Sequence, residues 1–237
     1  MRNTPGSSSC HIPSAARTAD FIERLSPDER IELESLRTFS DYSPGTTLFV
    51  EQQAADKVLF LLTGQVKLSL NSTTGRRVIL GIARPGETLG LASAFSGTSH
   101  DVTAETVAPS TIASVASADL LGFLSRHPSA YLYVARELGQ ECARACGQVR
   151  RLGLTVTASA RLVQFLLDKC AVAQQTRRGT RLFCALTHTE IGECIGVSRE
   201  TVTRLLSDFR CRELLESRGS TLIVSDRRAL EAYAGIE

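Results

Sequence analysis

Short apolar runs separated by turn residues occupy the chain from Phe39 to about Ala118. They include T-T-L-F-V, K-V-L-F-L-L, Q-V-K-L-S-L and T-I-A-S-V-A, with S-P-G, N-S-T-T-G and R-P-G-E among the spacers. Runs that recur about every ten residues, with glycine and proline between them, are typical of antiparallel sandwiches and small barrels. The strict alternation in residues 65–70 predicts a strand with one solvent-facing and one buried side. The interior of such a barrel has room for one small ligand, although side chains fill most of them.

Segments with the apolar spacing of helices precede and follow this β region. Residues 26–29, S-P-D-E, combine an N-cap, a first-turn proline and two acids, which predicts a short helix to about Thr38. Further helices are predicted at 117–124 and at about 158–173. The β region is therefore expected to lie between helical segments.

The longest helical pattern begins at Tyr131. Its apolar positions recur at alternating steps of four and three residues for about three heptads, which is the spacing of a coiled-coil seam. We interpret it as a parallel, two-stranded dimerisation helix. A long helix packed on its own barrel is the alternative that so short a seam leaves open. The seam positions are Tyr131, Ala135, Leu138, Cys142, Ala145, Val149 and Leu152.

Residues 186–212, L-T-H-T-E-I-G-E-C-I-G-V-S-R-E-T-V-T-R-L-L-S-D-F-R-C-R, predict two helices joined by a tight turn. Thr187 and Glu190 have the spacing of a capping box, Gly196 ends the first helix, and Ser198 caps the second. A solvated amphipathic helix is the plainer alternative for the second segment. Two capped helices around a glycine turn nevertheless favour a helix-turn-helix.

The second of these helices has one apolar and one polar face. An arginine at its start can pair bidentately with guanine, and a glutamate can accept from cytosine N4, so the polar face suits readout of the major groove. The stretch S-R-G-S-T-L-I-V-S then predicts a hairpin, or wing, whose tip arginine reaches phosphate. The predicted DNA-binding residues are Thr187, His188, Ser198, Arg199, Glu200, Thr203, Arg204 and Arg218.

Composition narrows the class of protein. The chain of 237 residues has 43% hydrophobic residues and a formal net charge of +2, so affinity for nucleic acid must come from local placement of arginine. No apolar run is long enough for a membrane span, and the N-terminal residues lack the apolar core of a signal peptide, so we expect a cytoplasmic protein.

Cysteine and histidine spacing argues against metal and disulfide chemistry. The seven cysteines are scattered through periodic segments without a CxxC, and the four histidines form no HxH or HxxxH pair. No nucleophile, base and orienting group can be assembled, so we expect no enzyme activity.

Over roughly residues 20 to 235 the sequence resembles the CRP/FNR transcription regulators. The most specific stretch is I-G-V-S-R-E-T-V-T-R-L-L, which is similar to the cyclic AMP receptor branch. The resemblance implies an α+β fold: an N-terminal β-roll (jelly roll) of the cyclic-nucleotide-binding type, a long dimerisation helix and a C-terminal winged helix-turn-helix. The expected parts are a flexible tail at 1–18, a sensor domain at 19–127, the dimerisation helix at 128–153 and the DNA-binding domain at 154–237.

The resemblance also implies the target. Arg199 and Arg204 would contact guanines and Glu200 a cytosine, in a TGTGA-like half-site repeated as a palindrome in double-stranded promoter DNA. The partners would be a second copy of the chain and, for an activator, RNA polymerase. The alternative is a small-molecule or redox sensor whose winged helix serves protein contacts and binds no DNA.

The predicted effector pocket departs from the family pattern. Leu91 stands where cyclic-nucleotide binders have the glutamate that holds the ribose, and His100-Asp101 stand where they have the arginine that holds the phosphate. Replacing that arginine by a group that is neutral near pH 7, beside an added carboxylate, disfavours cyclic AMP. The candidate pocket residues are Gly90, Leu91, His100, Asp101 and Cys146, the last of which stands where the branch contacts the base.

An iron-sulfur cluster and a haem group are both weakly supported as cofactors. Iron-sulfur sensors of the family carry several N-terminal cysteines, whereas Cys10 is alone there. The candidate haem ligands are scattered; His100 could serve as one, but a single histidine on a turn is more often a solvated surface residue. We therefore leave the effector unassigned.

Two cysteines of the long helix suggest a redox hypothesis. Cys142 lies on the seam, so a parallel dimer would bring its two copies together, and Cys146 lies one turn later. Both are more simply small buried hydrophobes. Oxidation of paired Cys142 thiols would instead fix the helix register.

Overall fold

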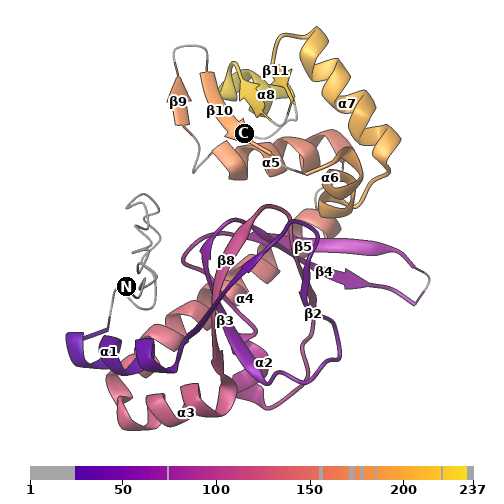
Figure 1. Cartoon of the computed structure of the whole chain (residues 1–237). Coiled ribbons are helices and arrows are strands. Elements are labelled where there is room, and N and C mark those ends of the chain that lie inside the picture. The colour runs from indigo at the N-terminus through magenta and orange to yellow at the C-terminus, as the bar shows by residue number, and fades with distance from the viewer. Residues whose placement is uncertain are drawn as a thin grey trace, which may run out of the picture.

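The computed structural model describes residues 25–73, 75–154, 157–170, 174–176, 179–184, 186–219 and 221–233. An N-terminal β-roll with its covering helices and a C-terminal domain of helices and a small sheet are joined by the long helix α4 (Tyr131–Gly153) (Figure 1). This is the α+β architecture that the sequence predicts.

Two antiparallel sheets of four described strands each form the roll. Their inner faces share one apolar core, which includes Phe49, Leu61 and Ile112. The first sheet has the order β1 (Thr38–Tyr42), β8 (Ser110–Ala116), β3 (Lys57–Thr63) and β6 (Thr88–Leu89). The second has the order β2 (Thr47–Phe49), β7 (Thr103–Thr106), β4 (Val66–Asn71) and β5 (Arg77–Ala83).

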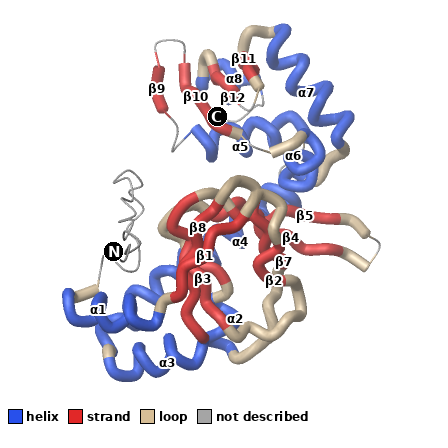
Figure 2. Tube along the Cα trace, in the orientation of Figure 1, coloured by secondary structure: helices blue, strands red, loops and turns tan. Residues whose placement is uncertain are grey.

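Helices cover the outer face of the first sheet. The short helix α1 (Pro27–Leu36) begins at the predicted capping box, in which Ser26 and Glu29 each accept a hydrogen bond from the other's backbone N–H. A second apolar core joins these helices to the sheet, and Figure 2 shows the strands of the roll between α1 and α3 on one side and the C-terminal domain on the other. The other helical elements here are α2 (Leu91–Ser96), α3 (Ser117–Arg126) and a 3-10 turn (Pro128–Ala130).

The long helix α4 turns only a narrow stripe toward its own chain. Val134 and Gln148 are its buried residues. The predicted seam lies elsewhere on the helix: Tyr131 is 42% and Val149 71% exposed, and Cys142 is exposed as well. The residues that recur at heptad spacing are therefore largely uncovered in a single chain.

The C-terminal domain packs four helices on one four-stranded sheet, counting the described segments. Its core holds Leu166, Ile195 and Phe209, all of which are fully buried. The sheet has the order β11 (Leu215–Arg218), β12 (Thr221–Val224), β10 (Gly179–Phe183) and β9 (Gln174–Thr176). The helices are α5 (Ala158–Cys170), α6 (His188–Ile195), α7 (Arg199–Cys211) and α8 (Arg227–Tyr233).

One expectation about the roll is wrong. The alternation in residues 65–70 predicts that Lys67 and Ser69 face solvent, yet they are only 5% and 0% exposed. The C-terminal domain lies over this side of β4, since α6 contacts the neighbouring strand β5 and Glu190 of α6 reaches Lys67. A pattern within one strand carries no information about a domain that docks on it.

Candidate nucleic-acid interface

The helix-turn-helix is built from three local devices. Thr187 and Glu190 form the predicted capping box at the start of α6, and Ser198 caps α7 by accepting from the N–H of Thr201. Gly196 ends α6 in the left-handed region, with φ of 69°. Gly192 was not singled out from the sequence, but a Cβ there would lie 2.6 Å from the carbonyl oxygen of Val197. Only glycine lets the turn approach α6 so closely.

Helix α7 separates a buried back from an exposed front. Val202, Leu206 and Phe209 are buried in the domain core. Arg199, Glu200, Thr203 and Arg204 are all exposed. The helix lies at the outer edge of the C-terminal domain, away from the roll (Figure 1). The structure thus brings the four predicted α7 residues together on one accessible surface.

Hydrogen bonds fix polar side chains on this surface, but they do not occupy the guanidinium groups of its two arginines. The ring Nδ1 of His188 lies 2.9 Å from the hydroxyl of Thr203, which donates to the carbonyl of Arg199. Neither Arg199 nor Arg204 forms an ion pair with any residue that the structure describes. Both guanidinium groups therefore keep their donors available to an incoming acceptor.

The charge of Glu200 is favoured by its place at the start of α7. Its own backbone N–H, and then the Ser198 side chain, hydrogen-bond to the carboxylate and hold the pKa of Glu200 below its usual value. A first-turn carboxylate also complements the positive end of the helix. Glu200 is thus an ionised acceptor at neutral pH.

The hairpin of β11 and β12 forms next to this helix. Gly219 at its tip has φ of 58°, and Arg210 of α7 donates to Ser217 of β11 at 3.3 Å. Arg218 is the last residue of β11, but its side chain lies outside the described part of the structure.

The roll contains a separate small cavity of about 150 Å³. Of the residues predicted for an effector pocket, Gly90, His100 and Asp101 line it. Leu91 is buried in the core between the first sheet and its helices, and Cys146 is exposed on α4, so neither lines the cavity. The sequence reasoning missed the carboxylates of Glu87 and Glu141 and the guanidinium of Arg144, because none matches the family's binding pattern.

The imidazole of His100 is buried, not solvated as a lone turn histidine was expected to be. It is 3% exposed and stacks on Phe49 with ring centroids 3.8 Å apart. Gly90, with φ of 77°, makes room for it: a Cβ there would lie 2.8 Å from His100 Cε1. Burial lowers the pKa of His100 against the opposing charges of Asp56 and Asp101. The side chain at the arginine position is therefore uncharged at neutral pH.

Two carboxyl groups beside this cavity resist ionisation. Burial raises the pKa of Glu87, with Arg144 at 3.7 Å opposing that shift, and burial likewise raises the pKa of Glu141. The guanidinium of Arg144 also lines the cavity, but it faces the carboxyl group of Glu87. A cavity that combines this pair with a neutral histidine and further carboxyl groups offers little net attraction to a phosphate. In the described part of the chain, no cluster of histidine, cysteine and acidic residues could hold a metal ion.

A buried polar contact holds the helix-turn-helix against the roll. The amine of Lys67 lies 2.8 Å from the carboxylate of Glu190 on α6 and 2.9 Å from that of Glu105 on β7. The amide of Gln148 on α4 donates to the carbonyls of Ile79 in the roll and Cys194 in α6. The roll, the long helix α4 and helix α6 of the C-terminal domain are therefore held together by the buried side chains of Lys67 and Gln148.

Comparison with known proteins identifies both domains. The cyclic nucleotide-binding domain matches residues 39–127, and the Crp-like helix-turn-helix domain matches residues 160–233. A global nitrogen regulator of Synechocystis is 32% identical over 167 residues, which span 69% of this chain and 74% of that protein.

The chain belongs to the CRP/FNR family of transcription regulators.

Other family members agree with this assignment. A CRP-like cAMP-activated global transcriptional regulator of Mycobacterium tuberculosis is 26% identical over 82% of this chain and 87% of its own. The structure of FixK2 from Bradyrhizobium japonicum has a TM-score of 0.74 at 24% identity and covers 83% of this chain and 96% of that one. The matched helix-turn-helix domain and the transcriptional regulators among the relatives indicate a DNA-binding regulator, so the alternative of a winged helix without DNA binding is not favoured. No helix in the described ranges has the length and apolar character needed to cross a bilayer.

The Lys67–Glu190 contact predicts a measurable coupling between the domains. Burial is the largest influence on both groups, yet their hydrogen bonds outweigh it, raising the pKa of Lys67 and lowering that of Glu190. Glu190 therefore stabilises docking above its ordinary pKa of 4.5 and stops doing so as pH falls through its lowered pKa. Lys67 contributes below 10.5 and loses its contribution as pH rises through its raised pKa.

We expect a double-mutant cycle of Lys67→Met and Glu190→Gln to give a coupling of about 0.5–3 kcal/mol in the free energy of unfolding. The coupling energy should be constant over the pH range in which Glu190 is ionised and Lys67 is protonated. It should decrease at lower pH, where Glu190 is protonated, and at higher pH, where Lys67 loses its proton. Lys57→Met, at an exposed lysine of β3, is the control. A coupling no larger than that of the control with Glu190→Gln would contradict the contact.

Proposed function

We propose that the protein is a homodimeric regulator that reads a palindromic, TGTGA-like site in promoter DNA. The observation that carries this proposal is the exposed set of Arg199, Glu200 and Arg204 on a helix whose back is buried, with neither arginine in an ion pair with a described residue. Two arginines aimed at guanines and one ionised glutamate aimed at a cytosine supply the donors and acceptor that such a half-site needs. Thr187, His188, Ser198, Thr203 and Arg218 complete the proposed interface.

The dimer is proposed to form along α4. Five of its seven seam positions are exposed in the single chain, and Leu138 and Leu152 are half-buried. The stripe with Val134 and Gln148, by contrast, already faces the roll. Burial of a seam of this length against a second copy removes apolar surface from water and relates the two copies of α7 by one two-fold axis. A two-fold arrangement is what a palindromic site requires.

We propose that the effector of the roll is not cyclic AMP. Support comes from the neutral, buried His100 in place of an arginine and from the carboxyl groups of Glu87, Asp101 and Glu141 around the cavity. The cavity volume of about 150 Å³ is also below the range of about 300–1,000 Å³ that is usual for ligand pockets.

Arg204→Ala is expected to weaken binding to the preferred site by about 1–3 kcal/mol and to relax preference at one base pair. Truncation removes a bidentate donor pair that a water molecule replaces poorly. Affinity for a panel of single-base variants of the site, measured by fluorescence anisotropy at fixed salt, tests this. Arg181→Ala, at an exposed arginine of β10, is the control. An equal loss on every sequence would instead identify a phosphate contact.

Val149→Asp is expected to shift the protein from dimer to monomer in sedimentation velocity, because it places two charges in the apolar seam. Val149 is 71% exposed in the single chain, so the substitution leaves the fold of each copy intact. Gln140→Asp, which changes charge by the same amount on an exposed position of α4 outside the seam, should remain dimeric. A dimer that survives Val149→Asp would place the interface elsewhere.

A parallel seam also predicts a cross-link. Oxidation of the two Cys142 thiols by diamide, which is reduced to its hydrazine as the disulfide forms, should give a dimer band in non-reducing electrophoresis. Cys142→Ser should abolish the band, while Cys146→Ser, one turn away, should preserve it. A band that depends on Cys146, or no band, would refute the Cys142 pairing.

A further inference from the structure

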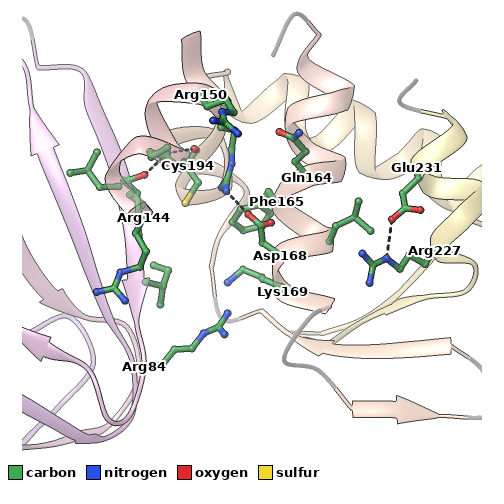
Figure 3. A pocket seen from close by; sticks show the side chains of 18 residues that line it. Arg84, Arg144, Arg150, Gln164, Phe165, Asp168, Lys169, Cys194, Arg227 and Glu231 are labelled. Carbon is green, nitrogen blue, oxygen red and sulfur yellow. Dashed lines mark hydrogen bonds and ion pairs between the residues drawn. The ribbon is translucent and has the colours of Figure 1, made fainter. Parts of the chain in front are cut away.

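A second, larger opening lies between the two domains. It encloses about 660 Å³ and is bounded by β5 of the roll, the C-terminal half of α4, and helices α5 and α8 (Figure 3). Its edge at residues 80–82 and Arg144 is shared with the small cavity of the roll, and no residue of α7 or of the wing lines it. We call this opening the interdomain groove. It is distinct from the proposed DNA-reading surface.

The lining of the interdomain groove is strongly cationic. Its two carboxylates are each matched by one arginine: Asp168 pairs with Arg151, and Glu231 lies 2.9 Å from Arg227. The groove thus holds an excess of positive charge in a chain whose formal net charge is only +2. The cationic lining residues are Arg84, Arg144, Arg150, Arg151, Lys169 and Arg227.

Like charges from the two domains point into the same space. Arg84 follows β5 of the roll and Lys169 belongs to α5, and both side chains extend into the opening in Figure 3. Neither forms an ion pair with any residue in the described ranges, and the Lys169 amine lies 5.0 Å from the centre of the Phe165 ring. Arg150 is likewise unpaired among the described residues, and Arg144 lies 3.7 Å from the carboxylate of Glu87.

This arrangement is unfavourable unless an anion occupies it. Burial lowers the pKa of Lys169 and is the largest influence on it; the Cys184 thiol opposes that shift, and the positive charge of Arg84 adds to it. Partly buried cations that repel one another across a water-filled opening attract counter-ions strongly. Arginine forks suit phosphate oxygens, and a lysine adds a point charge.

We propose that the interdomain groove binds a small molecule carrying at least two phosphate groups. Its volume lies within the range of about 300–1,000 Å³ that is usual for ligand sites, which admits pyrophosphate alone or a nucleoside diphosphate. One phosphate contacts Arg84 of the roll and the other contacts Lys169 of the C-terminal domain. Because the two cations belong to different domains, the bound anion fixes the C-terminal domain against the roll.

Isothermal titration calorimetry of the full chain with pyrophosphate, without DNA, tests the site. We expect saturable binding that weakens as salt rises, and at least about a tenfold loss of affinity in Arg84→Gln and in Lys169→Gln, since each removes a charged hydrogen-bond donor. Lys57→Gln removes the same charge from an exposed position outside the groove and should leave the affinity within about twofold. Adenosine diphosphate and adenosine, titrated in parallel, distinguish a nucleotide site from a phosphate site.

Two results would overturn the proposal: no binding of either diphosphate, or equal weakening by Lys57→Gln, which would indicate only a general attraction to a basic surface. Thermal unfolding of each variant without ligand checks that the fold persists. The outcome is independent of the proposed DNA site, because affinity of the ligand-free chain for promoter DNA is measured separately. Weakened binding to the preferred DNA site in Arg204→Ala, with unchanged pyrophosphate binding, would separate the two surfaces.

Discussion

The arrangement of the molecule depends on the buried amine of Lys67. A lysine that is 5% exposed is costly unless its charge is compensated, and here carboxylates from two directions compensate it, Glu105 within the roll and Glu190 on α6. Gln148 adds the matching neutral contact by satisfying one backbone carbonyl on each side. If the C-terminal domain moved away, Lys67 and Glu190 would lose their pairing, so the docking is specific and not merely apolar.

Glu190 has two tasks in this contact. One of its carboxylate oxygens accepts from the backbone and hydroxyl of Thr187 and so begins α6, while the other accepts from Lys67. The residue that starts the first helix of the motif is therefore also the residue that attaches the motif to the roll. Local helix formation and domain docking are consequently linked at one side chain.

The sequence was sufficient for features that are local. The capping boxes at Ser26 and Thr187, the N-cap at Ser198 and the turn at Gly196 depend on neighbours within four residues, and all are present. The exposed front of α7 follows from helical spacing in the same way. The predicted dimer, half-site and DNA contacts stay predictions, because they concern partners outside a single chain.

Features that depend on distant segments could not be predicted. Lys67 occupies a polar position in an alternating strand, and nothing within that strand indicates that Glu190, far along the sequence, will cover it. His100 was expected on a solvated turn, but Phe49 and the glycine at 90 create a slot that buries it. The interdomain groove likewise collects cations from β5, α4, α5 and α8, each of which is an ordinary surface arginine or lysine in its own segment.

The docking through α6 has a consequence for how such a regulator is controlled. The roll contacts the helix-turn-helix through α6 and not through α7. The exposed face of α7 therefore stays open to solvent while the two domains are in contact. Control through this contact therefore acts by orientation and not by occlusion. In a two-fold assembly, a change of a few degrees at α6 would alter the spacing between two reading helices, and the fit to both half-sites at once would be lost although each helix alone remained competent.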